Sequence, residues 1–272
     1  MKPSLFSRLF LFFLLANSFG VTGQGGTLHL IASIDNVNSD IRQGCQQDYQ
    51  SAVNHFSAVA QDAGMGFNQQ LLSFDLGAVS EYIQGFECSP NDVVVFFYSG
   101  HGVRYEDDGQ EWPWPYLYYC EKNPDNDPES CELDMDWVQE QLIAKNARMT
   151  IVLGDSCNDV QDSPEANNYL AGESAAREDP DPSEENSYSN LDLIRAFRGH
   201  IIASAASPGQ TSETNNAEGS YFAVEFFHFL LEALTTSNPT SWENILRKTK
   251  AKVQQVSGGN QTPQYCVNGR CG

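Results

Sequence analysis

Two runs of mainly apolar residues stand out in the pattern of hydrophobic and polar positions along this chain. They are residues 93–98, with the sequence VVVFFY, and residues 149–154, with the sequence MTIVLG. Uninterrupted apolar runs of this length are typical of strands that are buried on both faces of a parallel sheet. Both runs end abruptly in polar residues, SGHG after the first and DSC after the second. Ligands of open α/β sheets bind at the carboxyl ends of the strands, so the chemistry of this protein is expected there.

Shorter strands and amphipathic helices alternate around these two runs. The predicted strands are residues 27–34, 69–74 and 200–205, and the predicted helices are residues 45–64, a short segment before Pro90, 136–146, 190–197 and two segments near the carboxyl end. Gly64 is a natural end for the first helix. Strands that alternate with helices indicate an α/β fold with a mainly parallel central sheet.

The two helices near the carboxyl end have clear apolar faces. On the first of these helices, the side chains predicted to face inward are Ala223, Phe226, Phe227, Leu230, Leu231 and Leu234. The second is predicted to open with Thr240 and Glu243 as a capping box and to direct inward Trp242, Ile245, Leu246, Val253 and Val256. Both are therefore expected to cover a face of the sheet.

The first 23 residues have the pattern of a signal peptide. Lys2 and Arg8 precede the apolar run LFLFFLLA, and small and polar residues follow up to VTG. The apolar run is too short to cross a bilayer comfortably, although a membrane anchor or an apolar amino-terminal helix is the alternative. We expect cleavage near Gly23, a mature chain of residues 24–272, and a secreted or periplasmic location.

The chain is strongly acidic. Its formal net charge of −21 becomes −23 without residues 1–23, because that segment carries two positive charges and no negative ones. Such a charge disfavours nucleic acid or an anionic membrane as a partner and attracts basic polypeptides. With 272 residues and a hydrophobic content of 40%, the chain can bury the core of one large α/β domain or two small ones.

Seven cysteines are many for a chain of this class, and their number is odd. Secretion would permit disulfides, so six are expected to pair and one to remain a thiol. Cys266 and Cys271 can close a short loop, and Cys120 and Cys131 flank the turn-rich segment EKNPDNDPES. The spacings do not resemble those of a zinc site.

The residues after the two apolar runs suggest a nucleophile and its base. If the two strands are parallel neighbours, about 4.8 Å apart, His101 and Cys157 can face one another. An imidazole beside a thiol favours the thiolate and can later protonate a leaving amine. A core histidine and a buried structural cysteine are the alternative, but the glycines on both sides of His101 offer it little packing. Cys157 is then the expected free thiol.

The segments YSGHG and DSC, about fifty residues apart, resemble those of caspase-like peptidases, most closely the metacaspase branch. The segment IRQGCQQD is similar to the metacaspase stretch in which Gly-Cys precedes an acidic pocket residue, and GQTSET, GSYF and QTPQ are similar to later stretches of the same domain. The likeness covers roughly residues 27–266. It implies a caspase-haemoglobinase fold, with a mainly parallel sheet flanked by helices on both faces.

The resemblance also implies roles for particular residues. His101 corresponds to the general acid and base, Cys157 to the nucleophile, and the backbone amides of Gly102 and Cys157 to the oxyanion donors. Asp48 and Asp155 correspond to the specificity pocket of metacaspases, which prefer arginine or lysine, and two carboxylates suit a cationic side chain. Taken alone, Asp48 and Asp155 are explained as a helix-start acid and a loop cap. The implied function is a cysteine endopeptidase that acts on polypeptides with basic residues.

Some features depart from the family pattern. CNDVQDSPE follows the nucleophile instead of a turn similar to His-Ser-Gly, and Cys45 has a counterpart in intracellular relatives, where it is not in a disulfide. The alternatives are a legumain- or gingipain-like peptidase of the same fold and a non-catalytic caspase-like binding module. The sequence itself requires no cofactor, but many metacaspases need calcium, and YEDDGQE at residues 105–111 supplies carboxylates in the corresponding loop.

A long acidic segment divides the domain. A part like a large subunit extends to about residue 163, the acidic linker covers about 164–189, and a part like a small subunit covers about 190–272. Arg177 is the only basic residue in GESAAREDPDPSEEN, which makes it a candidate self-cleavage site for an enzyme that cuts after basic residues.

Overall fold

The computed structural model describes residues 26–105, 113–121, 131–161, 191–215, 217–236 and 238–272. The predicted signal peptide and the predicted acidic linker with Arg177 lie outside these residues. None of the helices in the described ranges combines the length and the apolar character that a membrane crossing requires.

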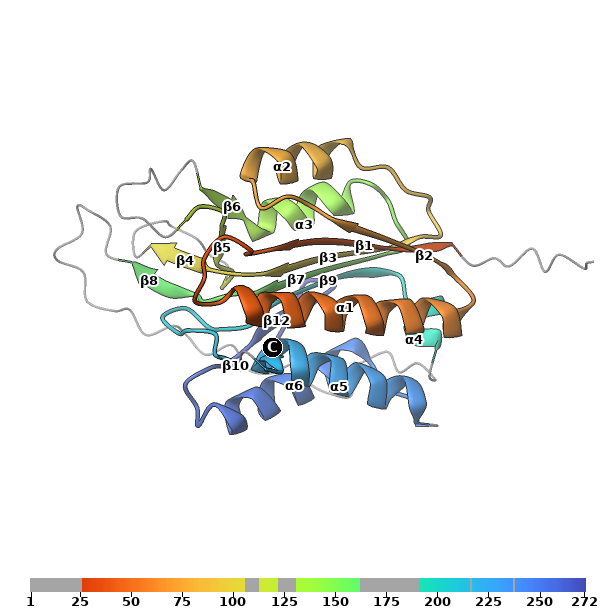
Figure 1. Ribbon diagram of the computed structural model, residues 1–272. Helices are drawn as coiled ribbons and strands as arrows, with labels where there is room; N and C mark the ends of the chain where they lie inside the picture. Colours follow the sequence, from red (N-terminus) through yellow and green to blue (C-terminus); the bar gives the residue numbers. More distant parts are fainter. Residues whose placement is uncertain (1–25, 106–112, 122–130, 162–190, 216, 237) are drawn as a thin grey trace, which may run out of the picture.

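A seven-stranded sheet forms the centre of the protein (Figure 1). Its order is β13 (Arg270–Cys271), β12 (Gln264–Val267), β9 (Gly199–Ser204), β7 (Met149–Asp155), β3 (Val93–Ser99), β1 (Thr27–Ile34) and β2 (Gly66–Leu71). The pairs from β9 to β2 are parallel, and β12 pairs antiparallel with both β9 and β13. The predicted α/β class with a mainly parallel sheet is confirmed.

Helices cover both faces of this sheet (Figure 1). On one face are α1 (Arg42–Ala63), α4 (Asp192–Arg195), α5 (Tyr221–Thr235) and α6 (Trp242–Val256), and on the other are α2 (Leu76–Gly85) and α3 (Met135–Ile143). Two smaller sheets complete the fold. They are β6 (Glu132–Asp134), β5 (Tyr116–Tyr118), β4 (Gly102–Tyr105) and β8 (Asp159–Gln161) in one, and β10 (Thr214–Asn215) with β11 (Gly219–Ser220) in the other.

Strand β3 explains why an apolar run needs no polar alternation. Its side chains point alternately into the two cores, so Val93, Val95 and Phe97 pack with α1 and α5. Val94, Phe96 and Tyr98 pack in the other core, with residues of α2 and α3. Because both faces are covered, every position of the strand is buried.

The second predicted strand was placed wrongly. It was predicted at residues 69–74, but β2 spans Gly66–Leu71 and its residues are mostly exposed. An edge strand with exposed side chains carries little hydrophobic signal, so its bounds depend on backbone pairing with β1, which begins at Thr27 opposite Gly66. Gly64 does end α1, in the left-handed conformation with φ of 68°.

Helix starts were predicted only approximately. Helix α1 begins at Arg42, three residues before Cys45, because the amide of Arg42 already donates to the carbonyl of Asn38 at 3.1 Å. The predicted capping box of α6 is wrong, since the N-cap is Ser241, whose hydroxyl accepts from the amide of Asn244. The carboxylate of Glu243 instead pairs with Arg270, 2.6 Å away.

Two residues predicted to face inward lie on the surface. Leu231 of α5 is 48% exposed and Val256 of α6 is 38% exposed. The buried stripe of α5 runs through Phe222, Phe226, Phe227, Leu230 and Ala233. Leu231 lies about 100° around the helix from Leu230, which turns it away from the sheet.

The prediction that six cysteines pair is also wrong. Disulfides join Cys120 to Cys131 and Cys266 to Cys271, whereas Cys45, Cys88 and Cys157 remain thiols. Cys45 lies on α1, and the Cys88 thiol is directed toward the carbonyl of Lys145, at 3.7 Å. Both disulfides close short loops, as their spacing predicted, and such bonds are compatible with an extracellular location.

Candidate active site

The register of the strands brings His101 and Cys157 together. Each residue of β3 stands opposite the residue of β7 that is 56 positions later, and β4 and β8 pair with the same offset of 56. His101 lies between β3 and β4, and Cys157 lies between β7 and β8. Since the offset is the same before and after them, the two residues stand level on neighbouring strands, whose backbones are about 4.8 Å apart.

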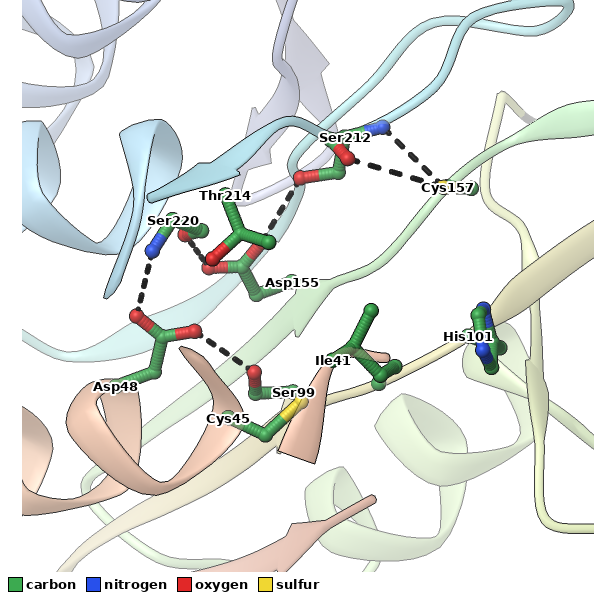
Figure 2. A pocket seen from close by; sticks show the side chains of 11 residues that line it. Ile41, Cys45, Asp48, Ser99, His101, Asp155, Cys157, Ser212, Thr214 and Ser220 are labelled. Atoms are coloured by element: carbon green, nitrogen blue, oxygen red, sulfur yellow. Dashed lines mark hydrogen bonds between the residues drawn. The ribbon is translucent and has the colours of Figure 1, made fainter. Parts of the chain in front are cut away.

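Both residues line one pocket at the carboxyl end of the sheet (Figure 2). The other lining residues come from the loop before α1, from α1 itself, from the ends of β3 and β7, and from the segment around β10 and β11. They are Ile41, Cys45, Asp48, Ser99, Gly100, Asp155, Ser212, Thr214 and Ser220. The pocket therefore joins segments from both sides of the predicted linker.

The glycines around His101 are required by close packing against a tyrosine side chain and against the backbone of Cys157. A Cβ at Gly100 would lie 2.6 Å from the hydroxyl of Tyr98, and a Cβ at Gly102 would overlap the carbonyl oxygen of Cys157. The His101 carbonyl accepts a hydrogen bond from the amide of Tyr118 at 3.0 Å, and the Tyr98 hydroxyl lies 2.8 Å from the same oxygen. The SGHG segment is thus held by its backbone, which leaves the imidazole to face the pocket.

The sulfur of Cys157 lies against the backbone of Ser212 (Figure 2). The amide of Ser212 donates to Sγ at 3.4 Å, and Sγ lies 3.9 Å from the carbonyl oxygen of the same residue. The amide is a donor that a thiolate could accept from, and the carbonyl oxygen is an acceptor for the protonated thiol, so the backbone of Ser212 contacts the sulfur in both protonation states.

His101 has a carboxylate near one ring nitrogen. Its Nε2 lies 3.8 Å from Oδ2 of Asp40, which belongs to the loop between β1 and α1. The side chain of His101 is 15% exposed and that of Asp40 is 64% exposed. Solvent screens this pair, so its contribution to the energy of the site is small.

Asp48 and Asp155 both lie on the floor of the pocket and are buried, with exposures of 2% and 3%. Asp48 accepts a hydrogen bond from the hydroxyl of Ser99 at 2.8 Å and one from the amide of Ser220 at 2.8 Å. Asp155 accepts from the hydroxyl of Ser212 at 3.1 Å and from the hydroxyl of Ser220. Each of the four carboxylate oxygens therefore has one donor (Figure 2).

The two carboxyl groups occupy an unfavourable electrostatic position. Burial raises the pKa of Asp48, and burial followed by the charge of Asp48 raises the pKa of Asp155. In the part of the chain that the structure describes, neither carboxylate forms an ion pair with a lysine, arginine or histidine. Two buried acids without a cation form a site that a positively charged ligand would stabilise.

Cys45 lies in the same pocket but differs from Cys157 in its surroundings. Burial raises the pKa of Cys45 to about 12, with the carboxylates of Asp48, Asp35 and Asp155 contributing in the same direction. A thiol with so high a pKa stays protonated at neutral pH and is a poor nucleophile. The pocket thus holds two thiols in different surroundings.

Sequence reasoning brought together four of these residues and missed the serines. Ser99 belongs to the SGHG segment, and Ser212 and Ser220 lie in the GQTSET and GSYF segments, which were noted for their resemblance to the family. The sequence therefore pointed to these segments but did not indicate what the serines do. Their roles follow from hydrogen bonds between residues that are between 51 and 172 positions apart in sequence.

Two of the predictions fall largely outside the described residues. Arg177, the predicted self-cleavage site, lies outside them. Most of the acidic loop 105–111, whose carboxylates could bind calcium, also lies outside them. Within the described ranges, no group of three or more histidine, cysteine, aspartate or glutamate side chains is arranged to hold a metal ion.

Comparisons with known proteins identify the family and the fold. The caspase-domain family model matches residues 30–270, which is nearly all of the chain. Among solved structures, the chain resembles the crystal structure of caspase-1 from Spodoptera frugiperda, with a TM-score of 0.54, 15% sequence identity, and coverage of 90% of this chain and 87% of that chain. No curated protein matches the sequence. The fold is that of a caspase, and the chain belongs to the caspase-domain family.

Proposed function

We propose that this chain is a cysteine endopeptidase that cleaves polypeptides after arginine or lysine. The observation that carries the proposal is the pair of buried carboxylates, Asp48 and Asp155, in the pocket that also contains Cys157. Four donors hold the four carboxylate oxygens in place, and the remaining lone pairs of these oxygens are available to a cation. A guanidinium or ammonium group at the end of a substrate side chain would supply the missing positive charge.

In the proposed reaction, the thiolate of Cys157 attacks the carbonyl carbon of the residue whose side chain occupies the pocket. The carbon–nitrogen bond then breaks, and the imidazolium of His101 protonates the leaving amine. Water hydrolyses the resulting thioester after His101 removes one of its protons, which restores the thiolate. The level arrangement of the two residues on neighbouring strands supports these roles.

The oxyanion of the tetrahedral intermediate would be bound by the backbone amides of Gly102 and Cys157. The close approach of Gly102 to the backbone of Cys157 supports this assignment, because it brings the two peptide segments together. Loss of one such donor typically costs about 10²–10³ in turnover.

We further propose that the chain belongs to the metacaspase branch and that it acts outside the cytoplasm. Acidic side chains on the pocket floor suit a basic substrate residue, whereas a pocket for aspartate would need cations. Two disulfides are compatible with an oxidising compartment, and the amino-terminal segment has the pattern of a signal peptide.

The test uses the mature chain, residues 24–272, and fluorogenic peptides that differ only in the residue before the scissile bond. Arginine and lysine peptides should be cleaved, and His101→Ala and Cys157→Ala should each abolish cleavage. Cys88→Ala is the matched control, because Cys88 is a thiol that does not line the pocket. Preferential cleavage after asparagine or aspartate would instead favour a legumain-like or caspase-like specificity, and binding of basic peptides without any cleavage would favour a non-catalytic module.

A further inference from the structure

The QTPQ segment, residues 261–264, reaches the loop that contacts the sulfur of Cys157. Gln261 is fully buried, with an exposure of 0%. Its Oε1 accepts from the amide of Glu213 at 3.0 Å, and its Nε2 donates to the carbonyl of Ala205 at 3.1 Å and to the hydroxyl of Ser212 at 3.2 Å. One side chain therefore bridges the two ends of the loop between β9 and β10.

Ser212, at one end of this loop, contacts the nucleophile and the pocket floor at the same time. Its amide donates to Sγ of Cys157 at 3.4 Å, and its hydroxyl donates to Oδ1 of Asp155 at 3.1 Å (Figure 2). Any movement of Ser212 would change both contacts together.

The directions of these hydrogen bonds follow from their partners. The amide of Glu213 can only donate and the carbonyl of Ala205 can only accept, so they decide which end of the Gln261 side chain is oxygen and which is nitrogen. The nitrogen can only donate to the hydroxyl of Ser212. The single proton of that hydroxyl is therefore left for Asp155.

We propose that Gln261 is a positioning residue for the peptidase reaction: it holds Ser212 so that this one residue supports both the thiolate of Cys157 and the charge of Asp155. The inference rests on the proposed function of His101 and Cys157. A glutamine with a merely structural role would affect the stability of the fold and leave thiol reactivity and substrate selectivity unchanged.

Two readouts separate the two contacts. The first is the rate at which iodoacetamide alkylates Cys157 at different pH values, followed by peptide mass spectrometry so that Cys45 and Cys88 are distinguished from it. The second is the ratio of kcat/KM for an arginine peptide to that for the matching citrulline peptide. The titratable groups that line the pocket with the sulfur are His101, Cys45, Asp48 and Asp155, and Asp40 faces His101. Asp159 and Glu213 follow Cys157 and Ser212 closely in sequence.

Gln261→Leu keeps the approximate volume of the side chain and removes its three hydrogen bonds. We expect it to move the alkylation profile to higher pH by roughly 0.5–1 pH unit, because the thiolate loses a well-placed donor. We also expect the preference for arginine over citrulline to fall by about tenfold, as Asp155 loses a hydrogen bond. Ser212→Ala keeps the backbone amide and removes only the hydroxyl, so it should lower the selectivity and leave the alkylation profile near that of the wild type.

Gln264→Leu is the matched control. Gln264 belongs to the same QTPQ segment, but its Nε2 donates to the hydroxyl of Ser207 and the carbonyl of Thr262 and not to Ser212. It should change neither readout. If Gln264→Leu shifts both readouts as much as Gln261→Leu does, a general loosening of the loop explains them and the proposal is wrong.

An unchanged alkylation profile and unchanged selectivity in folded Gln261→Leu would also overturn the proposal. If that variant does not fold, Ser212→Ala and Ser212→Thr test the contact with Asp155. Ser212→Thr retains the hydroxyl and should restore the selectivity that Ser212→Ala loses. Wild-type selectivity in Ser212→Ala would contradict the inference. The alkylation rate can be measured without any peptide cleavage. If the wild-type chain cleaves no peptide, the proposed function is refuted, and the alkylation profile of Gln261→Leu still tests the inference about Ser212.

Discussion

Replacing Asp155 by asparagine should have opposite effects on activity and on stability. Asp155 is 3% exposed, and both of its oxygens accept hydroxyl hydrogen bonds. Asparagine has almost the same shape and keeps one acceptor oxygen, so the main loss is the negative charge that Asp155 would carry when a cationic side chain is bound. Opposite charges about 4 Å apart attract by about 4 kcal/mol at an effective dielectric constant near 20. Asp48 would compensate in part, which leaves about 2–4 kcal/mol, or roughly a 30- to 1000-fold loss in kcat/KM for arginine peptides.

The same change should stabilise the fold at neutral pH. Burial and the charge of Asp48 raise the pKa of Asp155, so this carboxyl binds its proton more tightly in the folded chain than in the unfolded one. The folded state therefore loses stability as the pH rises from about 4 through the raised pKa. Asp155→Asn removes this loss. A gain of about 1 kcal/mol would raise Tm by roughly 2–4 °C at pH 8, and the gain should shrink as the pH falls toward 4.

The assay combines peptide kinetics with thermal unfolding. Values of kcat/KM for matched arginine and citrulline peptides should converge in Asp155→Asn, because only arginine uses the lost charge. Tm should be measured between pH 4 and pH 8 for the wild type and the variant. A variant that keeps its arginine preference, or that is less stable than the wild type at pH 8, would refute the reasoning that Asp155 is a buried charge held for a cationic ligand.

Three further predictions concern other residues. In the native chain, iodoacetamide should label Cys157 long before Cys45, because burial raises the pKa of the Cys45 thiol to about 12. Peptide mapping that finds the reverse order would contradict the assignment of the nucleophile. Gly219→Ala should reduce the cleavage of arginine peptides by at least tenfold. Gly219 has φ of 102°, and a Cβ there would overlap a carboxylate oxygen of Asp48. Unchanged kinetics would show that Asp48 is not needed in its present position. Self-cleavage should produce a fragment that begins immediately after Arg177, and Arg177→Ala should prevent it; amino-terminal sequencing of incubated wild type and variant, with calcium added or chelated, would detect a cut elsewhere or none.

The sequence alone determined the fold class and the position of the two residues that we propose for catalysis. Strands β3 and β7 are buried on both faces, so their apolar runs were visible without any knowledge of the fold. The SGHG and DSC segments follow those runs immediately, and parallel neighbours end at the same edge of a sheet. The position of His101 and Cys157 at that edge was therefore predictable once the two strands were taken as neighbours.

Features with a weak local signal were predicted less well. β2 is an edge strand with exposed side chains, and its bounds follow from pairing with β1. The spacing predicted both disulfides, but whether further cysteines pair depended on which sulfur atoms meet in space, so the count of seven led to one disulfide too many. The odd count was a correct reason to expect a thiol at Cys157 but did not reveal Cys45 and Cys88.

Only the tertiary structure decided how the pocket is held. Ser212 donates to Asp155 across 57 positions of sequence, Ser220 donates to it across 65, and Gln261 donates to Ser212 across 49. Hydrophobic periodicity describes which side of one element faces the core, over a few residues at a time. Hydrogen bonds between distant loops have no such period, because they depend on where separate elements bring single donors and acceptors together.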